Sequence, residues 1–369
     1  MSTRRGPVGV GLIGAGTISG AYLRNLTRFP DVHVHVVGDL VPDVAAARAE
    51  EFGVPHSGSP ADVLGNDDVE IVVNLTIPAA HAEISTLAAQ SGRHVWSEKP
   101  LALDRDSARA VVDAAGEAGV RLGCAPDTVL GAGIQTALRV IAAGDIGRPL
   151  AGLTLLQGPG PESWHPNPAF LFQHGGGPLF DMGPYYLTTL VQALGPATRV
   201  AAVGSRATPT RVIGSGPLAG QVFDVEVPTH VAMLAQFAAG GTSQSIFSFE
   251  SPLSRGGFVE ITGTEATLSL PDPNMFDGDL RIRRLGSEDW EPIELAGVSA
   301  GRGLGVLDMA RSIRAGVPHR ITGELAQHVL DLMVSASESA AGARFVELTS
   351  TVEPFEPLPA GWDPFERTV

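Results

Sequence analysis

The sequence is short of cysteine, of basic charge and of long uninterrupted hydrophobic runs. Cys124 is the single cysteine of the 369 residues, so no disulfide can form within the chain, which suits a reducing compartment and leads us to expect a cytoplasmic protein. Lys and Arg total 25 against 40 Asp and Glu, which gives a net charge of -15. A chain with this much negative charge lacks the basic surface through which proteins bind nucleic acids and anionic membranes. We therefore expect neither as a partner.

Other absences narrow the class of protein further. No segment has the apolar length that a membrane span requires. Arg4 and Arg5 faintly resemble a twin-arginine export signal, but the apolar residues 8–13 run into a glycine turn and are better interpreted as a strand. Cysteine and histidine nowhere have the spacing of metal ligands, so we expect no metal site.

The first third of the chain alternates strand-like and helix-like segments. Apolar, β-branched runs predict strands, and apolar residues at helical spacing predict helices between them. The predicted strands cover residues 8–13, 32–37, 70–75, 94–97 and 120–124. Repeated β-α units imply a parallel sheet with helices on both faces, so we predict an α/β Rossmann domain over residues 1–125.

Residues 126–369 have a different pattern. A predicted helix over residues 133–143 is followed by several strands, and only residues 304–315 and 323–340 show strong helical spacing again. The predicted strands cover residues 150–156, 200–204, 230–237, 242–249, 259–262, 267–270 and 280–283. We therefore predict an α+β domain for substrate binding and oligomerisation, built on a large, mostly antiparallel, open-faced sheet.

The few helices of this second domain would leave one face of its sheet uncovered. Phe237, Phe247 and Phe249 lie on the predicted strands, and an uncovered face that carried them would be apolar. Large exposed apolar patches favour self-association, so we expect a homo-oligomer, either a dimer or a tetramer.

A dinucleotide-binding fingerprint follows the first predicted strand. Gly14-Ala15-Gly16-Thr17-Ile18-Ser19 fits it with a serine, nearly as small as glycine, in the third glycine position. Gly14 permits the tight turn, and Gly16 lets the backbone approach a pyrophosphate at the N-terminus of the next helix. A plain glycine turn is the alternative, but the strand before it and the helix after it favour a cofactor site.

Asp39 follows the second predicted strand, where an acid holds the ribose hydroxyls of adenosine in such folds. A carboxylate at this point repels the 2′-phosphate of NADP, and no arginine follows in Leu40-Val41-Pro42. We therefore expect NAD rather than NADP. A helix-capping role for Asp39 is the alternative, and the two roles are compatible.

Ligands of open parallel sheets bind beyond the carboxyl ends of the strands, so residues just past other strands are candidates. Lys99, in Glu98-Lys99-Pro100, could orient a substrate hydroxyl and lower its pKa, or act as the base if burial lowers its own pKa. A solvated lysine is the alternative. Asp127, which follows the last predicted strand of the domain, is a candidate substrate ligand.

The segment from Gly175 to Tyr186 combines flexible glycines with an acid and two phenols. Asp181 and Tyr185 are four residues apart, so on a helix they share one face. A carboxylate and a phenol that converge on Lys99 would form a proton-relay site. A purely structural role for this segment is an equal alternative.

Together these segments resemble the Gfo/Idh/MocA oxidoreductases, which include glucose–fructose oxidoreductase and inositol dehydrogenases. The resemblance covers almost the whole chain and rests on Gly14-Ala15-Gly16, Thr76-Ile77-Pro78 to His81, Glu98-Lys99-Pro100 and Gly175 to Tyr185. It implies catalytic roles for Lys99 and Asp181 and a cis Lys99–Pro100 bond. It implies NAD(P) bound at Gly14, Gly16, Asp39, Thr76, Pro78, His81 and Glu98, to which we add Thr17, Ile18, Leu40, Ile77 and Lys99.

The chain also departs from the family's pattern. The family usually has a histidine where Tyr185 stands and often an aspartate where Thr188 stands. Because an unperturbed tyrosine ionises at about pH 10, Tyr185 needs Lys99 beside it to accept a proton near neutral pH. His165, next to Trp164 in a loop, is the alternative proton acceptor. The Trp164 ring suits the apolar side of a sugar, although a buried tryptophan that anchors the loop is the structural alternative.

We therefore expect an NAD(P)-dependent dehydrogenase that acts on a CH–OH group of a sugar, an anhydrosugar or a cyclic polyol. Hydride leaves the alcohol carbon while Tyr185, or else His165, takes the hydroxyl proton. The expected substrate site comprises Lys99, Asp127, Trp164, His165, Asp181 and Tyr185. The rivals are an NAD-dependent glycosidase that oxidises a ring hydroxyl transiently and a non-catalytic regulatory protein that binds NAD.

Overall fold

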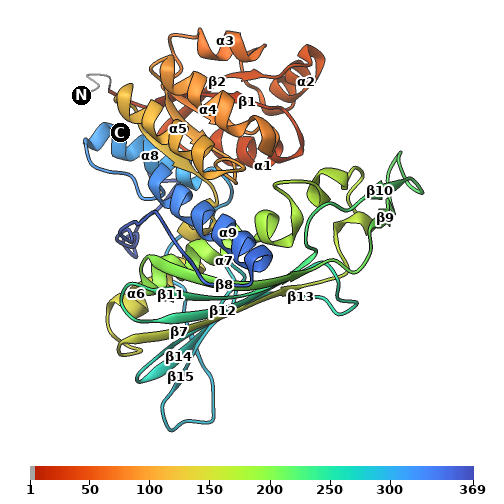
Figure 1. Ribbon diagram of the computed structural model, residues 1–369. Coiled ribbons are helices and arrows are strands. Elements are labelled where there is room, and N and C mark those ends of the chain that lie inside the picture. Colours follow the sequence, from red (N-terminus) through yellow and green to blue (C-terminus); the bar gives the residue numbers. More distant parts are fainter. Residues whose placement is uncertain (1–4) are drawn as a thin grey trace. The chain divides into compact units, whose positions relative to one another are not determined.

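The computed structural model describes residues 5–369, which divide into two compact units (Figure 1). The first unit comprises the described part of Met1–Ala132 together with Ala296–Gln327 and Leu358–Val369. The second comprises Gly133–Leu295 and His328–Pro357. The chain thus leaves the first unit and returns to it twice. Arg4, which belongs to the export-like pair, lies outside the described residues.

The first unit contains a parallel six-stranded sheet in the order β3-β2-β1-β4-β5-β6. Its strands are β1 (Val8–Ile13), β2 (Val32–Gly38), β3 (His56–Gly58), β4 (Ile71–Asn74), β5 (His94–Ser97) and β6 (Leu122–Cys124). Every residue of β1 and β4 is buried, as expected for central strands covered on both faces. The strand order reverses between β1 and β4, so the ligand crevice of such a sheet lies beyond their carboxyl ends.

Local sequence explains where the helices of the first unit start and stop. Ser59 and Asp62 form a capping box at α3, the Asp104 side chain caps α5, and left-handed Gly53 ends α2. The helices are α1 (Thr17–Leu26), α2 (Pro42–Phe52), α3 (Pro60–Leu64), α4 (His81–Gln90), α5 (Arg105–Glu117) and α8 (Leu304–Ala315), with short 3₁₀ turns at Pro78–Ala80 and Asp127–Leu130.

The position of α8 corrects one expectation. The sequence suggested that this late helix covers the antiparallel sheet, but α8 belongs to the first unit and packs beside β6 and β4. Gly305 lies so close to the Trp96 ring that a β-carbon there would be 1.9 Å from it. Arg311 pairs with buried Asp31 at 2.7 Å, and Arg314 contacts both oxygens of Glu70. These long-range contacts are invisible to helical periodicity.

The second unit contains a nine-stranded sheet in the order β16-β15-β14-β13-β7-β12-β11-β8-β17. Only the β7–β12 pairing within it is parallel, so the prediction of a large, mostly antiparallel sheet beside a Rossmann domain is confirmed. The strands are β7 (Pro149–Gln157), β8 (Ala197–Ser205), β11 (His230–Phe237), β12 (Thr242–Ser248), β13 (Arg255–Gly263), β14 (Ala266–Leu270), β15 (Leu280–Arg284), β16 (Glu291–Ile293) and β17 (Val346–Glu347). A separate ribbon pairs β9 (Thr210–Val212) with β10 (Val222–Asp224).

Helix α7 covers one face of this sheet. It packs on β7, β11 and β12, and Figure 1 shows α9 on the same side. Gly152 on β7 leaves room for Leu190 of α7, since a β-carbon at Gly152 would lie 2.4 Å from that side chain. The helices are α6 (Ala132–Ala142), α7 (Gly177–Leu194) and α9 (Gly323–Gly342), with 3₁₀ turns at Pro161–Ser163 and Ala169–Phe172. No helix in the described part of the chain is long and apolar enough to cross a membrane.

The opposite face of the sheet exposes several apolar side chains, but not the expected ones. Phe237, Phe247 and Phe249 are all buried, so they do not form an exposed surface. The outward positions alternate with the buried ones, and they carry Leu153, Val203, Leu234 and Phe258, which are 41%, 67%, 52% and 37% exposed. Register decides which residues face outward, and the sequence pattern did not reveal it.

Candidate active site

The glycine loop after β1 has the geometry that a dinucleotide needs. Gly14 has φ +102°, and a β-carbon there would lie 2.6 Å from the Leu75 backbone, so only glycine fits. Gly16 is exposed with open space where a β-carbon would lie, and α1 begins after it without a side-chain cap. The first N–H groups of α1 are therefore available for an anion, and these residues fit a pyrophosphate.

Asp39 holds this loop in place. Its carboxylate accepts hydrogen bonds from the backbone N–H of Ala15 at 2.8 Å and of Val41 at 2.9 Å. Each carboxylate oxygen has further acceptor capacity, so ribose hydroxyls can still bind to it. Helix α2 begins at Pro42 with no side-chain cap, so the capping alternative for Asp39 is wrong. Leu40 beside it is 89% exposed.

The residues after β4 divide into exposed and buried ones. Ile77 is 68% exposed, and the half-buried Thr76 donates its hydroxyl to Asn74 at 2.7 Å. His81 is buried, with Nδ1 2.7 Å from the Pro100 carbonyl and Nε2 3.0 Å from the Thr76 carbonyl. Burial lowers the pKa of the His81 imidazole. Both of its nitrogens contact protein carbonyls, so His81 connects the turn at Thr76 to Pro100.

Glu98 is buried in a polar chain beneath Lys99. It accepts hydrogen bonds from the Tyr22 hydroxyl at 2.8 Å and from the Lys99 backbone N–H at 3.0 Å. Trp96 donates to the same Tyr22 hydroxyl at 3.2 Å, and burial raises the pKa of Tyr22. The Lys99–Pro100 bond is cis, as the family resemblance implied. Nothing in the sequence distinguishes Tyr22 from the apolar residues at helical spacing on α1.

Asp127 does not have the position expected of a substrate ligand. Its side chain has no exposed surface, and its Oδ2 accepts the Gly303 N–H at 2.7 Å and the Gly305 N–H at 3.3 Å. It thus caps α8 from a distant part of the chain, with Arg302 3.7 Å away. Burial raises the pKa of the Asp127 carboxyl to about 6. In the described conformation Asp127 holds the fold of the first unit.

A cavity of about 240 Å³ lies within the second unit and brings Asp181 and Trp164 together. Asp181 comes from the second turn of α7, and Trp164 from the loop after β7. Trp164 is 68% exposed, so the alternative of a buried anchor is wrong. The lining consists of Leu156, Gln157, Gly158, Pro159, Gly160, Pro161, Trp164, Asp181, Met182, Ser248, Phe249 and Ser254. A carboxylate, hydroxyls and an exposed indole above an apolar floor can bind a ring that carries hydroxyl groups.

Neither candidate proton acceptor is among these lining residues. Tyr185 lies one turn after Asp181 on α7 and is only 5% exposed. His165 is half-buried, and its Nδ1 accepts the Asn167 N–H at 3.1 Å. Its ring packs 5.6 Å from that of Phe170. Lys99 belongs to the first unit, whereas all the cavity residues belong to the second.

Family models match both parts of the chain. Residues 8–125 match the model described as an oxidoreductase family with an NAD-binding Rossmann fold, and residues 134–269 match a GFO/IDH/MocA C-terminal domain.

Curated relatives match over much of their length. The 1,5-anhydro-D-fructose reductase of Ensifer adhaerens is 30% identical over 264 residues, which cover 70% of this chain and 74% of that protein. The scyllo-inositol 2-dehydrogenase (NAD(+)) of Bacillus subtilis is 26% identical, and the match covers 70% of this chain and 72% of that protein. A solved levoglucosan dehydrogenase in complex with NADH and L-sorbose has a TM-score of 0.82 at 22% identity, covering 94% of this chain and 100% of that one.

Proposed function

Because this chain belongs to the Gfo/Idh/MocA family of NAD-binding oxidoreductases, we propose that it oxidises or reduces a ring position of a sugar, an anhydrosugar or a cyclic polyol. The observation that carries the proposal is the cavity where Asp181 faces the same space as the exposed ring of Trp164. An indole packs against the C–H face of a sugar ring, and a carboxylate accepts hydrogen bonds from its hydroxyls. The relatives named above act, by their names, on an anhydrosugar and an inositol.

The cofactor site uses residues of the first unit. The loop of Gly14 and Gly16, with the first N–H groups of α1 at Thr17 and Ile18, would bind the pyrophosphate, and Asp39 the ribose. The exposed side chains of Leu40 and Ile77 would flank the adenosine end, while Thr76, Pro78 and Glu98 complete the site. Bound NAD supplies the hydride acceptor. His81 would act through the backbone it connects rather than by contact.

Lys99 has the central role in moving the proton. It is the single lysine of the chain, and every other residue in the Lys and Arg total is an arginine. A guanidinium stays protonated in proteins, whereas a lysine ammonium can release its proton when its surroundings favour it. In a chain whose other basic residues are arginines, a lysine at this position fits a role in proton transfer. Lys99 would polarise the substrate hydroxyl, and Asp181 would hold Lys99 or a neighbouring hydroxyl.

The proton acceptor would be Tyr185, one helical turn after Asp181. A nearby ammonium from Lys99 would favour the phenolate, and burial of the phenol would oppose it. His165 remains the second candidate because it adjoins Trp164 in the cavity loop. This part of the proposal requires Lys99 to approach Asp181 and Tyr185.

We also propose that the two parts of the chain have different roles. Residues 1–125 would bind the cofactor, and the second unit, which lies within residues 126–369, would bind the substrate and form a dimer or tetramer through the open sheet face, where Val203 and Leu234 are exposed. The cytoplasmic location expected from the single cysteine belongs to the same proposal.

A panel of neutral sugars, inositols and anhydrosugars tests the function. Each is incubated with NAD while the absorbance of the reduced nicotinamide is followed, and turnover of at least one ring alcohol is the expected result. Tight NAD binding without turnover of any of them would favour the regulatory alternative. Release of nitrophenol from nitrophenyl glycosides without net NADH formation would favour the glycosidase.

A further inference from the structure

We propose that Arg211, a residue outside the cavity lining, positions two walls of the substrate cavity and thereby sets its width. This inference rests on the proposed function, because it treats the cavity of Trp164 and Asp181 as the substrate site. Arg211 lies on β9, in the two-stranded ribbon that leaves the large sheet.

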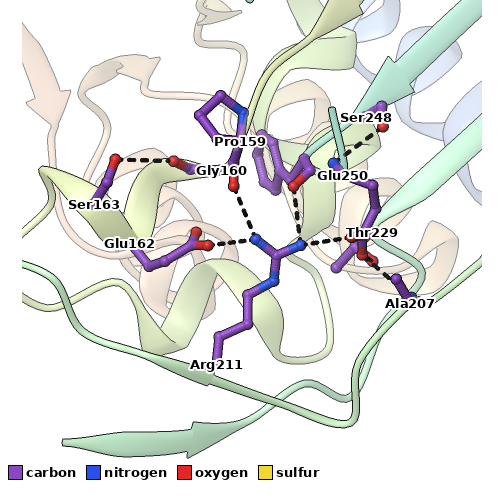
Figure 2. Close-up of polar contacts among 10 residues, drawn as sticks. Pro159, Gly160, Glu162, Ser163, Ala207, Arg211, Thr229, Ser248 and Glu250 are labelled. Carbon is purple, nitrogen blue, oxygen red and sulfur yellow. Dashed lines mark hydrogen bonds and ion pairs between the residues drawn. The ribbon is translucent and has the colours of Figure 1, made fainter. Parts of the chain in front are cut away.

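The Arg211 guanidinium joins the loop after β7 to the end of β12 (Figure 2). On the first side it donates to the Pro159 carbonyl at 3.0 Å and to the Glu162 carboxylate. On the second side it donates to the Phe249 carbonyl at 2.9 Å and pairs with Glu250 at 3.0 Å. Pro159 and Phe249 both line the cavity, so one side chain holds two of its walls at a fixed separation.

These contacts identify Arg211 as a positioning residue. Its side chain is only 10% exposed, and its single positive charge is paired with two carboxylates. It also lies over the ring of Phe172, 5.2 Å from the ring centre. Partial burial alone would raise the pKa of Glu250, but hydrogen bonds from Thr229, Ala207 and Arg211 lower it overall. The guanidinium therefore has charged partners already and is not set up to bind an anionic substrate.

The loop packs closely around this contact. Gly160 lines the cavity with φ +101°, and a β-carbon there would lie 2.3 Å from a Glu162 oxygen and 2.7 Å from Arg211. A second contact joins the loop to the chain just after β9, where the Gly214 N–H donates to the Glu162 carbonyl at 2.7 Å. Substitutions in the ribbon should therefore change substrate binding by displacing the loop.

Arg211→Met tests the proposal, with Arg284→Met on the exposed end of β15 as the matched control. Loss of the guanidinium leaves Glu162 and Glu250 without their shared cation, so the walls should separate. We expect the KM for the sugar found in the panel to rise about 10- to 100-fold, with little change in kcat or in NAD affinity. Backbone amides of residues 158–164 should exchange hydrogen faster by about 10-fold or more in the absence of any sugar. Arg284→Met should change none of these.

The triple variant Arg211→Met, Glu162→Gln, Glu250→Gln separates positioning from simple stability. It removes the repulsion between the carboxylates, so exchange in residues 158–164 and the KM should move back toward wild type. A lower kcat at unchanged KM in Arg211→Met would mean a smaller folded fraction and would overturn the proposal, as would unchanged exchange in that loop. If the wild type turns over no sugar, the proposed function fails, and the exchange measurement alone decides whether Arg211 holds the cavity loop.

Discussion

The Asp39 carboxylate accepts the backbone N–H of Ala15 at 2.8 Å, so the acid after β2 and the glycine loop after β1 form one structure. Asp39→Ala should therefore weaken NAD binding in two ways, by removing a ribose ligand and by releasing the loop. Loss of a hydrogen bond to a charged group costs about 1.5–3 kcal/mol, or roughly 10- to 100-fold in Kd. NADP should lose less, because repulsion of its 2′-phosphate disappears as well. Titrations with both cofactors measure this.

Asp39→Asn is the matched control, since an amide oxygen can still accept the Ala15 N–H. It should keep the loop in place while removing the negative charge, so the preference for NAD should narrow through tighter NADP binding. An Asp39→Asn variant that prefers NAD as strongly as the wild type would contradict the electrostatic account.

Tyr185→Phe should abolish most turnover and leave NAD binding nearly unchanged. Losing a general acid or base costs about 100- to 10,000-fold in rate, and the phenyl ring still fills the buried position on α7. His165→Ala serves as the comparison, because His165 lies in the cavity loop without lining the cavity. If the roles are reversed, Tyr185→Phe will keep near-normal turnover and His165→Ala will not. Steady-state rates on the substrate from the panel decide between them.

Stability should fall as the solution becomes acidic. Burial lowers the pKa of His94 to about 4, so below about pH 6.5 the unfolded chain binds a proton that folded His94 does not. At pH 5 this residue alone should cost about 2 kcal/mol of folding free energy relative to pH 7. Burial lowers the pKa of other histidines in the same direction, namely His35, His81, His319 and His328.

His94→Asn tests the sign of this effect. Its side-chain oxygen can replace the His94 Nδ1, which accepts the Arg121 N–H at 2.9 Å, but it does not titrate. Thermal unfolding midpoints between pH 5 and pH 7.5 should therefore vary less in His94→Asn. Asp127→Asn should do the opposite, because the raised pKa of Asp127 adds stability as the pH falls below about 6. Parallel pH profiles for all three proteins would show that these groups do not control stability.

The exposed sheet face should hold the oligomer together. Val203 and Leu234 face outward on neighbouring strands β8 and β11, so Val203→Asp with Leu234→Asp puts charges into an apolar interface. Light scattering at micromolar concentration should show an oligomer for the wild type and a monomer for this variant. Leu87→Asp, on the exposed side of α4, is the control and should leave the mass unchanged. A monomeric wild type would refute the interface.

Sequence patterns predicted the fold well where interactions between residues close in the chain determine it. The apolar run of β1 and the glycines after it predicted a Rossmann sheet, and the succession of strand-like segments after residue 150 predicted a mostly antiparallel sheet. The short strands β3, β9, β10, β16 and β17 were missed, because two or three residues give no measurable period. The inward or outward orientation of Phe247 depends on register, which sequence alternation does not reveal.

The site residues show the same limit. Gly14, Gly16 and Asp39 were predicted because their roles follow from a short motif. Asp127 looked like any acid beyond a strand, since its partners Gly303 and Gly305 are far along the chain. Arg211 gave no signal at all, because its role depends on a loop and a strand end that only the folded chain brings together.

Transfer of deuterium from the substrate tests the central claim most directly. The sugar or polyol found in the panel is prepared with deuterium on its ring carbons and incubated with NAD, and the nicotinamide product is analysed by mass spectrometry. We predict NADH that carries one deuterium from the oxidised carbon, and a loss of this signal in Lys99→Ala when NAD is present at a saturating concentration. NADH without deuterium, or full transfer by Lys99→Ala, would contradict it.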